Sequence, residues 1–329
     1  MMSFKNVMGH SRPIELLRRA IQRDKTAHSY LFVGNEGIGK KVVALQFAKA
    51  LNCLDEGPDR GDACDRCLSC KKIDHALHPD VLLIEPIGQG IRKEQVLQMQ
   101  KELAYKPYEG KRRVCILTAA DRMAHDIPNT LLKTLEEPPL HTVIILLANS
   151  TRFILPTILS RCQPVRFNPL PVSLVSKWLM EGSGLDEAEA HLLASLSEGS
   201  PGKAMEIREE IHQIPREELL RDWVGSKSLS YEKTGRWVEG LPAQRENLLL
   251  VLEVSKTLLR DLVVVKTLKE RPILIHSDLL EVMEPLAANW SLSSLLKRMD
   301  VLHRATVAIR SNANTRLALE AMMISWAEG

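Results

Sequence analysis

The sequence predicts an α/β domain built on a parallel sheet, followed by a small helical domain and an all-α C-terminal domain. Three observations support this fold class. Up to about residue 170, short apolar runs alternate with amphipathic stretches, which is typical of a parallel sheet covered by helices. The first of these runs leads through a glycine-rich loop into a helical pattern. From residue 172 onward, apolar residues recur at helical spacing only.

Five short apolar runs in the first domain predict its strands. They are Tyr30–Val33, Val81–Ile84, Val114–Leu117, Val143–Leu147 and Val165–Phe167. Their continuous apolar character fits a parallel sheet, because its strands are buried on both faces. Asn168-Pro169-Leu170-Pro171 follows the last run, and its two prolines can continue neither a strand nor a helix. The first domain is therefore expected to span residues 1–170.

The rest of the chain is predicted to be helical. Between residues 171 and 214 the helical pattern is broken at Gly182-Ser183-Gly184 and again at Gly199-Ser200-Pro201-Gly202. Residues 215–329 contain periodic segments such as 248–268 and 292–309 and no strand pattern. We expect residues 171–214 and 215–329 to form two separate helical domains.

Composition limits the class of protein. The chain has 329 residues, of which 45% are hydrophobic and 26% charged, enough for two or three domains with cores. It has neither an apolar run of transmembrane length nor the apolar core of a signal peptide, so a cytoplasmic protein is expected. The net charge of +3 argues against indiscriminate DNA binding. Lys111-Arg112-Arg113 is a local basic cluster, interpreted as a solvated loop.

The first predicted strand runs into Gly34-Asn35-Glu36-Gly37-Ile38-Gly39-Lys40-Lys41 and then into a helix. This order of strand, loop and helix is that of a phosphate-binding P-loop. The glycines let backbone N–H groups surround a phosphate, and Lys40 is expected to reach the β- and γ-phosphates of ATP or ADP. The predicted nucleotide-binding residues of the loop are Gly34, Gly37, Gly39, Lys40 and Lys41.

Two groups needed for hydrolysis are missing. The loop ends in Lys41 instead of the Ser or Thr whose hydroxyl ligates Mg²⁺, and an ammonium cannot ligate a cation. Thr118 and Ala119 follow the third strand, where P-loop enzymes place the acids that hold Mg²⁺ and position water. The nearby Asp121 is interpreted as a helix N-terminal cap. We expect ATP hydrolysis by this chain to be absent or very weak.

Four cysteines follow the helix after the P-loop, within an insertion at about residues 53–70. Cys53, Cys64, Cys67 and Cys70 have the spacing C-x10-C-x2-C-x2-C, which suits one tetrahedral Zn²⁺. Disulfides or free thiols are the alternatives, and a reducing cytosol argues against disulfides. Because four sulfurs leave no site for water, the zinc is expected to be structural. His75 and His78 are interpreted as surface residues, and Cys115 and Cys162 as buried apolar residues.

Several motifs together resemble the AAA+ subunits of bacterial clamp loaders. These are Ala27-His28-Ser29-Tyr30-Leu31-Phe32, the P-loop, the four cysteines, Leu131-Leu132-Lys133-Thr134-Leu135-Glu136-Glu137-Pro138-Pro139 and Ser160-Arg161-Cys162. The resemblance covers about residues 1–205. In this family, catalytic gamma/tau subunits keep the hydroxyl after the loop lysine and an Asp-Glu pair after the third strand. Delta-prime subunits often lack these groups but keep the zinc module, so Lys41, Thr118 and Ala119 resemble the delta-prime type.

The resemblance implies roles for further residues. Arg161 resembles an arginine finger that reaches ATP held by a neighbouring subunit, although a surface Arg at a helix end is the alternative. Asn149 resembles a sensor 1 residue, and a turn-forming Asn explains it equally well. Lys203 occupies the place of the sensor 2 arginine. Glu136 and Glu137 are not expected to be catalytic acids.

The resemblance also implies domain roles and partners. Residues 171–214 would form a lid, and residues 215–329 a collar that holds the chain in an open ring. The implied partners are gamma/tau and delta subunits of DNA polymerase III, the sliding clamp and primed DNA, with no membrane partner. Two alternatives remain: a catalytic gamma/tau-type ATPase, against which the missing groups argue, and a zinc-dependent DNA-binding adaptor, against which the low net charge argues.

Overall fold

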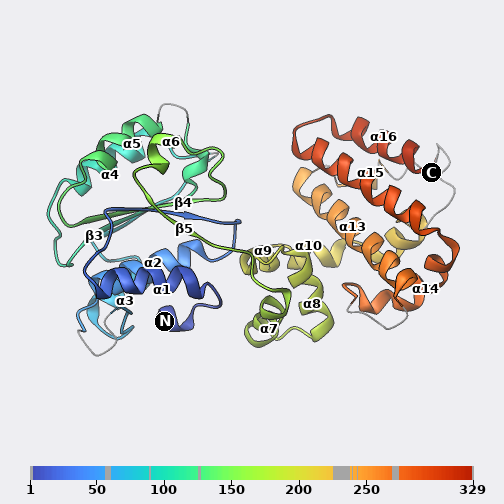
Figure 1. The fold of residues 1–329 in the computed structure, drawn as a ribbon, viewed down its shortest axis with the longest axis horizontal. Helices are drawn as coiled ribbons and strands as arrows, with labels where there is room; N and C mark the ends of the chain where they lie inside the picture. The colour runs from blue at the N-terminus through green and yellow to red at the C-terminus, as the bar shows by residue number, and fades with distance from the viewer. Residues whose placement is uncertain are drawn as a thin grey trace. The chain divides into compact units, whose positions relative to one another are not determined.

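The computed structural model describes residues 3–55, 61–88, 90–124, 127–224, 238, 240–242, 244–268 and 274–327. Part of the predicted cysteine insertion, residues 56–60, lies outside this described set. The chain divides into two compact units, Met1–Leu170 and Pro171–Gly329 (Figure 1).

A five-stranded sheet forms the centre of the first unit. Its strands are β1 (Ser29–Val33), β2 (Val81–Ile84), β3 (Arg113–Leu117), β4 (Thr142–Ala148) and β5 (Gln163–Arg166). The strand order is β2-β3-β4-β1-β5, and all neighbouring strands are parallel. The predicted parallel α/β domain is therefore confirmed. Since parallel strands end at one edge of a sheet, the loops after β1, β3 and β4 meet there.

Helices cover both faces of the sheet. The helical segments of this unit are η1 (Phe4–Asn6), α1 (Ser11–Gln22), α2 (Lys40–Asn52), α3 (Leu68–Asp74), α4 (Lys93–Leu103), η2 (Ala120–Arg122), α5 (Ile127–Glu136) and α6 (Pro156–Leu159). Helices α1 and α2 lie on one face, and α4, α5 and α6 lie on the other (Figure 1). Leu17, Phe32 and Phe47 belong to the core on the α1–α2 face, whereas Leu31, Met99 and Leu131 belong to the opposite core.

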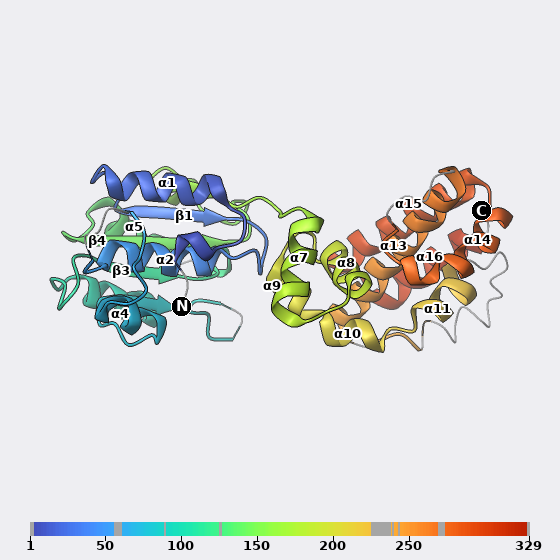
Figure 2. The same cartoon turned by 90° about the horizontal axis from the view of Figure 1, so that it is seen from below.

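The described part of the second unit is helical. Its segments are α7 (Val172–Ser183), α8 (Glu187–Leu196), α9 (Pro201–Glu206), α10 (Arg208–Gln213), α11 (Arg216–Glu218), η3 (Leu219–Val224), α13 (Arg245–Thr267), η4 (Ser277–Leu279), α14 (Leu280–Asn289), α15 (Leu292–Arg310) and α16 (Thr315–Ala327), and most are labelled in Figure 2. The two long periodic segments of the sequence correspond to α13 and α15. The assignment of residues 171–214 as a lid and 215–329 as a collar stays a prediction. Among the described residues, no helix is both long and apolar enough to cross a membrane.

Candidate functional site

The phosphate loop joins the carboxyl end of β1 to the start of α2, and it needs glycine at two positions for different reasons. Gly39 has φ = 107°, a left-handed conformation that side chains rarely adopt. A Cβ atom on Gly34 would lie 2.6 Å from the carbonyl oxygen of Phe167, so the close approach of β1 to the end of β5 excludes a side chain. The loop thus has the predicted order of strand, loop and helix, and nucleotide binding by it stays a prediction.

Lys40 lies inside the loop and ties it to the end of β4. Its side chain is only 8% exposed, and its Nζ donates to the carbonyl oxygens of Gly34 and Asn35, the latter at 2.8 Å. The same atom donates to Oδ1 of Asn149 at 3.0 Å. Burial lowers the Lys40 pKa to about 8, although the carboxylates of Asp121 and Glu36 act in the opposite direction. The structure therefore brings the predicted loop lysine and the predicted sensor 1 residue into contact.

Lys41 points to a different partner. Its Nζ lies 2.8 Å from Oε1 of Glu85, which follows β2. Both side chains are about half exposed, so the pair remains in contact with water. The ammonium at the position of the Mg²⁺-ligating hydroxyl is thus held by a carboxylate of its own chain.

The residues after β3 carry no acid in the positions where hydrolysis would need one. Thr118 uses its hydroxyl to donate to the carbonyl oxygen of Ile84 at 3.2 Å. Ala119 follows in a left-handed conformation, with φ = 52°. Asp121 was expected to cap a helix, but its Oδ2 instead accepts the backbone N–H of Asn149 at 3.0 Å. Asp121 therefore links the ends of β3 and β4, a role that sequence spacing could not reveal.

Arg161 follows α6, and its conformation is set by several contacts. The Ser29 hydroxyl donates to the Arg161 carbonyl oxygen at 2.7 Å, which fixes the backbone against the start of β1. One terminal guanidinium nitrogen, Nη1, donates to the Thr157 carbonyl oxygen at 2.9 Å and to the Ser160 hydroxyl at 3.2 Å. The other, Nη2, lies 2.7 Å from Oε1 of Glu136. The side chain remains 35% exposed.

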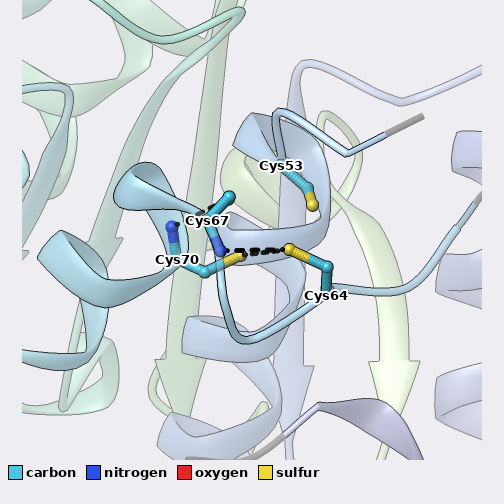
Figure 3. A group of neighbouring side chains, drawn as sticks. All are labelled: Cys53, Cys64, Cys67 and Cys70. Carbon is cyan, nitrogen blue, oxygen red and sulfur yellow. Dashed lines mark hydrogen bonds between the residues drawn. The ribbon is translucent and has the colours of Figure 1, made fainter. Parts of the chain in front are cut away.

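The four cysteines of the insertion converge as their spacing predicts. Figure 3 shows them at the end of α2, in the following loop and at the start of α3. Their Sγ atoms all lie within 4.8 Å of one another, and those of Cys64 and Cys70 are 4.0 Å apart. None of the four forms a disulfide. In a tetrahedral site with Zn–S bonds of about 2.3 Å, sulfurs lie about 3.8 Å apart, so the donor set fits Zn²⁺.

The local backbone supports thiolate formation at one of these positions. Burial acts to raise the Cys67 pKa, but the N–H groups of Cys70 and Leu54 outweigh it and lower the pKa to about 7. Burial raises the pKa values of Cys53 and Cys70. Thiolates are the form that binds metal, and a bound cation would favour that form at all four positions.

His75 and His78 were both expected at the surface. His75 is exposed. His78 is instead buried, and its Nδ1 accepts the Asp80 backbone N–H at 3.2 Å. Cys115 and Cys162 are buried, as expected.

Lys49 is a residue of the cysteine region that the sequence did not single out. Its side chain, on α2, is fully buried, and its Nζ forms ion pairs with Asp65 and with Asp74, the latter at 2.8 Å. Asp65 lies between two of the cysteines, and Asp74 ends α3. Although burial alone would lower the Lys49 pKa, the two carboxylates raise it. The ion pairs therefore fasten the cysteine segment to the helix that begins at the phosphate loop.

Two further predictions concern basic residues. Lys203 belongs to the second unit, where its Nζ lies 3.0 Å from Oε1 of Glu198, and its sensor 2 role stays a prediction.

The basic cluster at residues 111–113 does not form one solvated face. Arg113 begins β3, is only 7% exposed and lies 3.3 Å from Asp80 through its Nε, because the sheet requires it inside the fold.

The sheet order, the phosphate loop and the covering helices define a AAA+-type P-loop domain. Residues 9–171 match the protein family described as "DNA polymerase III, delta subunit". The chain is 28% identical over 327 residues to DNA polymerase III subunit delta' of Bacillus subtilis, covering 97% of this chain and 96% of that protein. It is 30% identical over 318 residues to the subunit delta' of Pseudomonas aeruginosa, covering 93% of each chain.

A match to a tau subunit is shorter. DNA polymerase III subunit tau of Bacillus subtilis is 30% identical over 213 residues, covering 63% of this chain and 37% of that protein. The similarity to delta' subunits thus extends over nearly the whole chain, whereas that to tau does not. This chain belongs to the family of DNA polymerase III delta' subunits, and the predicted resemblance to clamp-loader subunits is confirmed.

Proposed function

We propose that this chain acts in a clamp loader as a subunit that does not hydrolyse ATP efficiently and instead supports hydrolysis by a neighbour. The observation that carries the proposal is the contrast between two sites on one domain. At the phosphate loop, Lys41 pairs with Glu85 where an Mg²⁺ ligand is needed, and Thr118 and Ala119 provide no acid. On the same domain, the partly exposed guanidinium of Arg161 is held by an ion pair and hydrogen bonds of its own chain.

In the proposed assembly, Arg161 reaches ATP bound by an adjacent gamma/tau-type subunit. Its guanidinium would stabilise the negative charge that develops on the γ-phosphate during hydrolysis. The assembly, which also contains a delta subunit, would open a sliding clamp and place it on primed DNA in the cytoplasm. The full-length similarity to delta' subunits supports this assignment over the catalytic gamma/tau alternative.

The phosphate loop would at most hold ATP or ADP statically. Lys40 would contact the phosphates by exchanging its present hydrogen bonds to Gly34, Asn35 and Asn149 for bonds to phosphate oxygens. Binding without turnover fits the replacement of the Mg²⁺-ligating hydroxyl by Lys41 and the lack of a carboxylate at positions 118 and 119. Lys203 would contribute as a sensor 2 residue if the second unit closes over the nucleotide.

An arginine replacement tests the proposed function. In a reconstituted loader, Arg161→Ala should lower hydrolysis by about 10³-fold at the one site that this chain serves, because a trans arginine contributes about that much. The total ATPase activity of the loader should therefore fall by the fraction that this one site contributes. Arg19→Ala, at a 62% exposed side chain on α1, is the matched control and should leave activity unchanged. An intact complex that keeps full DNA-stimulated activity with Arg161→Ala would refute the role.

We also propose that Cys53, Cys64, Cys67 and Cys70 hold one structural Zn²⁺. Their four sulfurs would complete the coordination sphere, so the metal would organise the insertion and take no part in catalysis. The convergence of the four Sγ atoms, with no disulfide between any of them, supports this assignment.

Metal analysis tests the zinc site. Protein purified without chelators should contain one equivalent of zinc, and Cys67→Ser should lose most of it because a hydroxyl is a poor zinc ligand. Cys115→Ala, which alters a buried cysteine of β3 outside the cluster, should keep its zinc. Wild-type protein that contains no metal after such a preparation would contradict the proposal.

A further inference from the structure

Glu136 is the last residue of α5, and its carboxylate contacts the guanidinium of Arg161 at 2.7 Å. The two residues come from segments 25 positions apart, so their contact depends on the packing of α5 beside α6. The Glu136 side chain is 47% exposed and the Arg161 side chain is 35% exposed. Ion pairs with this much access to water contribute little to folding stability, so stability alone does not explain the arrangement.

Among the described residues, the contacts of Arg161 use only part of its hydrogen-bonding capacity. A guanidinium has five N–H donors, and the contacts with Thr157, Ser160 and Glu136 use three of them. Two donors therefore remain for an anion on another molecule. Since the Ser29 hydroxyl also holds the Arg161 carbonyl oxygen, both ends of the residue are fixed.

We infer that Glu136 is a positioning residue for Arg161, a role that rests on the proposed arginine-finger function. Its carboxylate holds one terminal nitrogen of the guanidinium while the Thr157 carbonyl holds the other. A long arginine side chain otherwise samples many rotamers, and only a fraction of them would direct the free donors toward a neighbour's phosphate. Holding the finger before the subunits meet raises the share of encounters that are ready for hydrolysis.

The adjacent residue provides a matched control. Glu137 has the same side chain, is also exposed and lies one position further along, but Glu136 carries the contact with Arg161. If negative charge at the end of α5 were all that mattered, replacing either glutamate would lower activity equally. If Glu136 positions Arg161, only the replacement of Glu136 lowers activity.

The test uses the reconstituted loader and separates kcat from KM for ATP. We expect Glu136→Ala to lower the DNA-stimulated kcat at the site served by this chain about 10-fold, with KM nearly unchanged. Glu136→Gln should recover part of the loss, because the amide oxygen can still accept the hydrogen bond. Glu137→Ala should match wild type. Gel filtration and thermal unfolding should show that every variant folds and assembles.

A double-mutant cycle then distinguishes positioning from a structural role. If Glu136 acts through the guanidinium, Glu136→Ala should have no further effect in the Arg161→Ala background. The same 10-fold loss in both backgrounds would overturn the inference. If Arg161→Ala lowers activity and Glu136→Ala does not, the positioning role fails while the proposed function stands. If Arg161→Ala itself has no effect on activity, the proposed arginine-finger function fails, and the positioning role fails with it.

Discussion

At the scale of single residues, Lys49 shows how the stability of a fold with a buried charge depends on the charges that compensate it. Its ammonium is completely buried between the carboxylates of Asp65 and Asp74. Removing one member of such a group leaves the remaining charges without compensation, which typically costs about 3–5 kcal/mol. Because the two carboxylates here are 18% and 24% exposed, we expect Lys49→Met to destabilise the first unit by about 2–3 kcal/mol.

Chemical denaturation monitored by circular dichroism measures this effect. Lys71→Met serves as the control, because Lys71 lies on α3 three positions before Asp74 but is exposed, and its replacement should change stability by less than about 0.5 kcal/mol. If Lys49→Met were as stable as the wild type, the two ion pairs would have no net role in fastening the cysteine segment.

The candidate sites differ in how far the sequence could reveal them. The cysteine spacing alone brings four ligands together, because their chain separations are short. The pairing of Lys41 with Glu85 joins residues 44 positions apart, and that of Glu136 with Arg161 depends on how α5 packs. No local pattern encodes such contacts. The first contact requires the strand order, which places the ends of β1 and β2 on one edge of the sheet. The second lies at the opposite edge, where Arg161 contacts the start of β1.

At the scale of elements, the limits of strand prediction have a physical basis. Four strands were predicted from continuous apolar runs, and each lies within one residue of its predicted ends. β5 begins at Gln163, two residues before the predicted start, because it is an edge strand with three exposed residues. An edge strand needs fewer apolar side chains, so its polar beginning does not look like a strand.

His276 connects three parts of the second unit and makes that unit sensitive to acid. Its buried ring contacts Thr257 of α13 at 2.9 Å through Nε2 and Arg216 of α11 at 3.2 Å through Nδ1. These contacts suit a neutral ring that accepts from the guanidinium and donates to the hydroxyl. Burial, and secondarily the Arg216 charge, lower the His276 pKa to about 3.

The direction of the pH effect follows from this lowered pKa. Between pH 6.5 and about 3 the unfolded chain binds a proton that the folded unit does not, so stability is lost as the pH falls from 6.5. From pH 6.5 to 4.5 the loss should reach about 2–3 kcal/mol. Urea unfolding followed by tryptophan fluorescence reports on this unit alone, since all five tryptophans lie within it. They are Trp178, Trp223, Trp237, Trp290 and Trp326.

The acid sensitivity should depend on His276 specifically. His276→Gln should flatten the difference in stability between pH 7 and pH 4.5, even if it lowers stability at both values. His303→Gln, at an exposed position of α15, should leave the pH dependence as in the wild type. An unchanged pH dependence in His276→Gln would assign the acid sensitivity to other groups.

At the scale of the whole molecule, the sequence predicted a parallel α/β domain followed by helices and a replication family, and both predictions hold. The family could be recognised because its motifs are local and follow a fixed order. The candidate phosphate site, in contrast, depends on the edge of the sheet, where several loops meet. There, an ammonium–carboxylate pair stands in the place of a metal ligand, and the two residues directly after β3, Thr118 and Ala119, are not acids.

These two losses lead to a prediction about the isolated chain. With Mg²⁺ and ATP it should show no turnover above background, and Lys41→Thr alone should not create activity. The new hydroxyl could ligate Mg²⁺, but Thr118 and Ala119 would still offer no carboxylate to hold the metal or orient water. Phosphate release measured with and without primed DNA checks this outcome. A turnover rate that rose about 10-fold or more with Lys41→Thr would mean that another acid, such as Asp121, takes over the missing role.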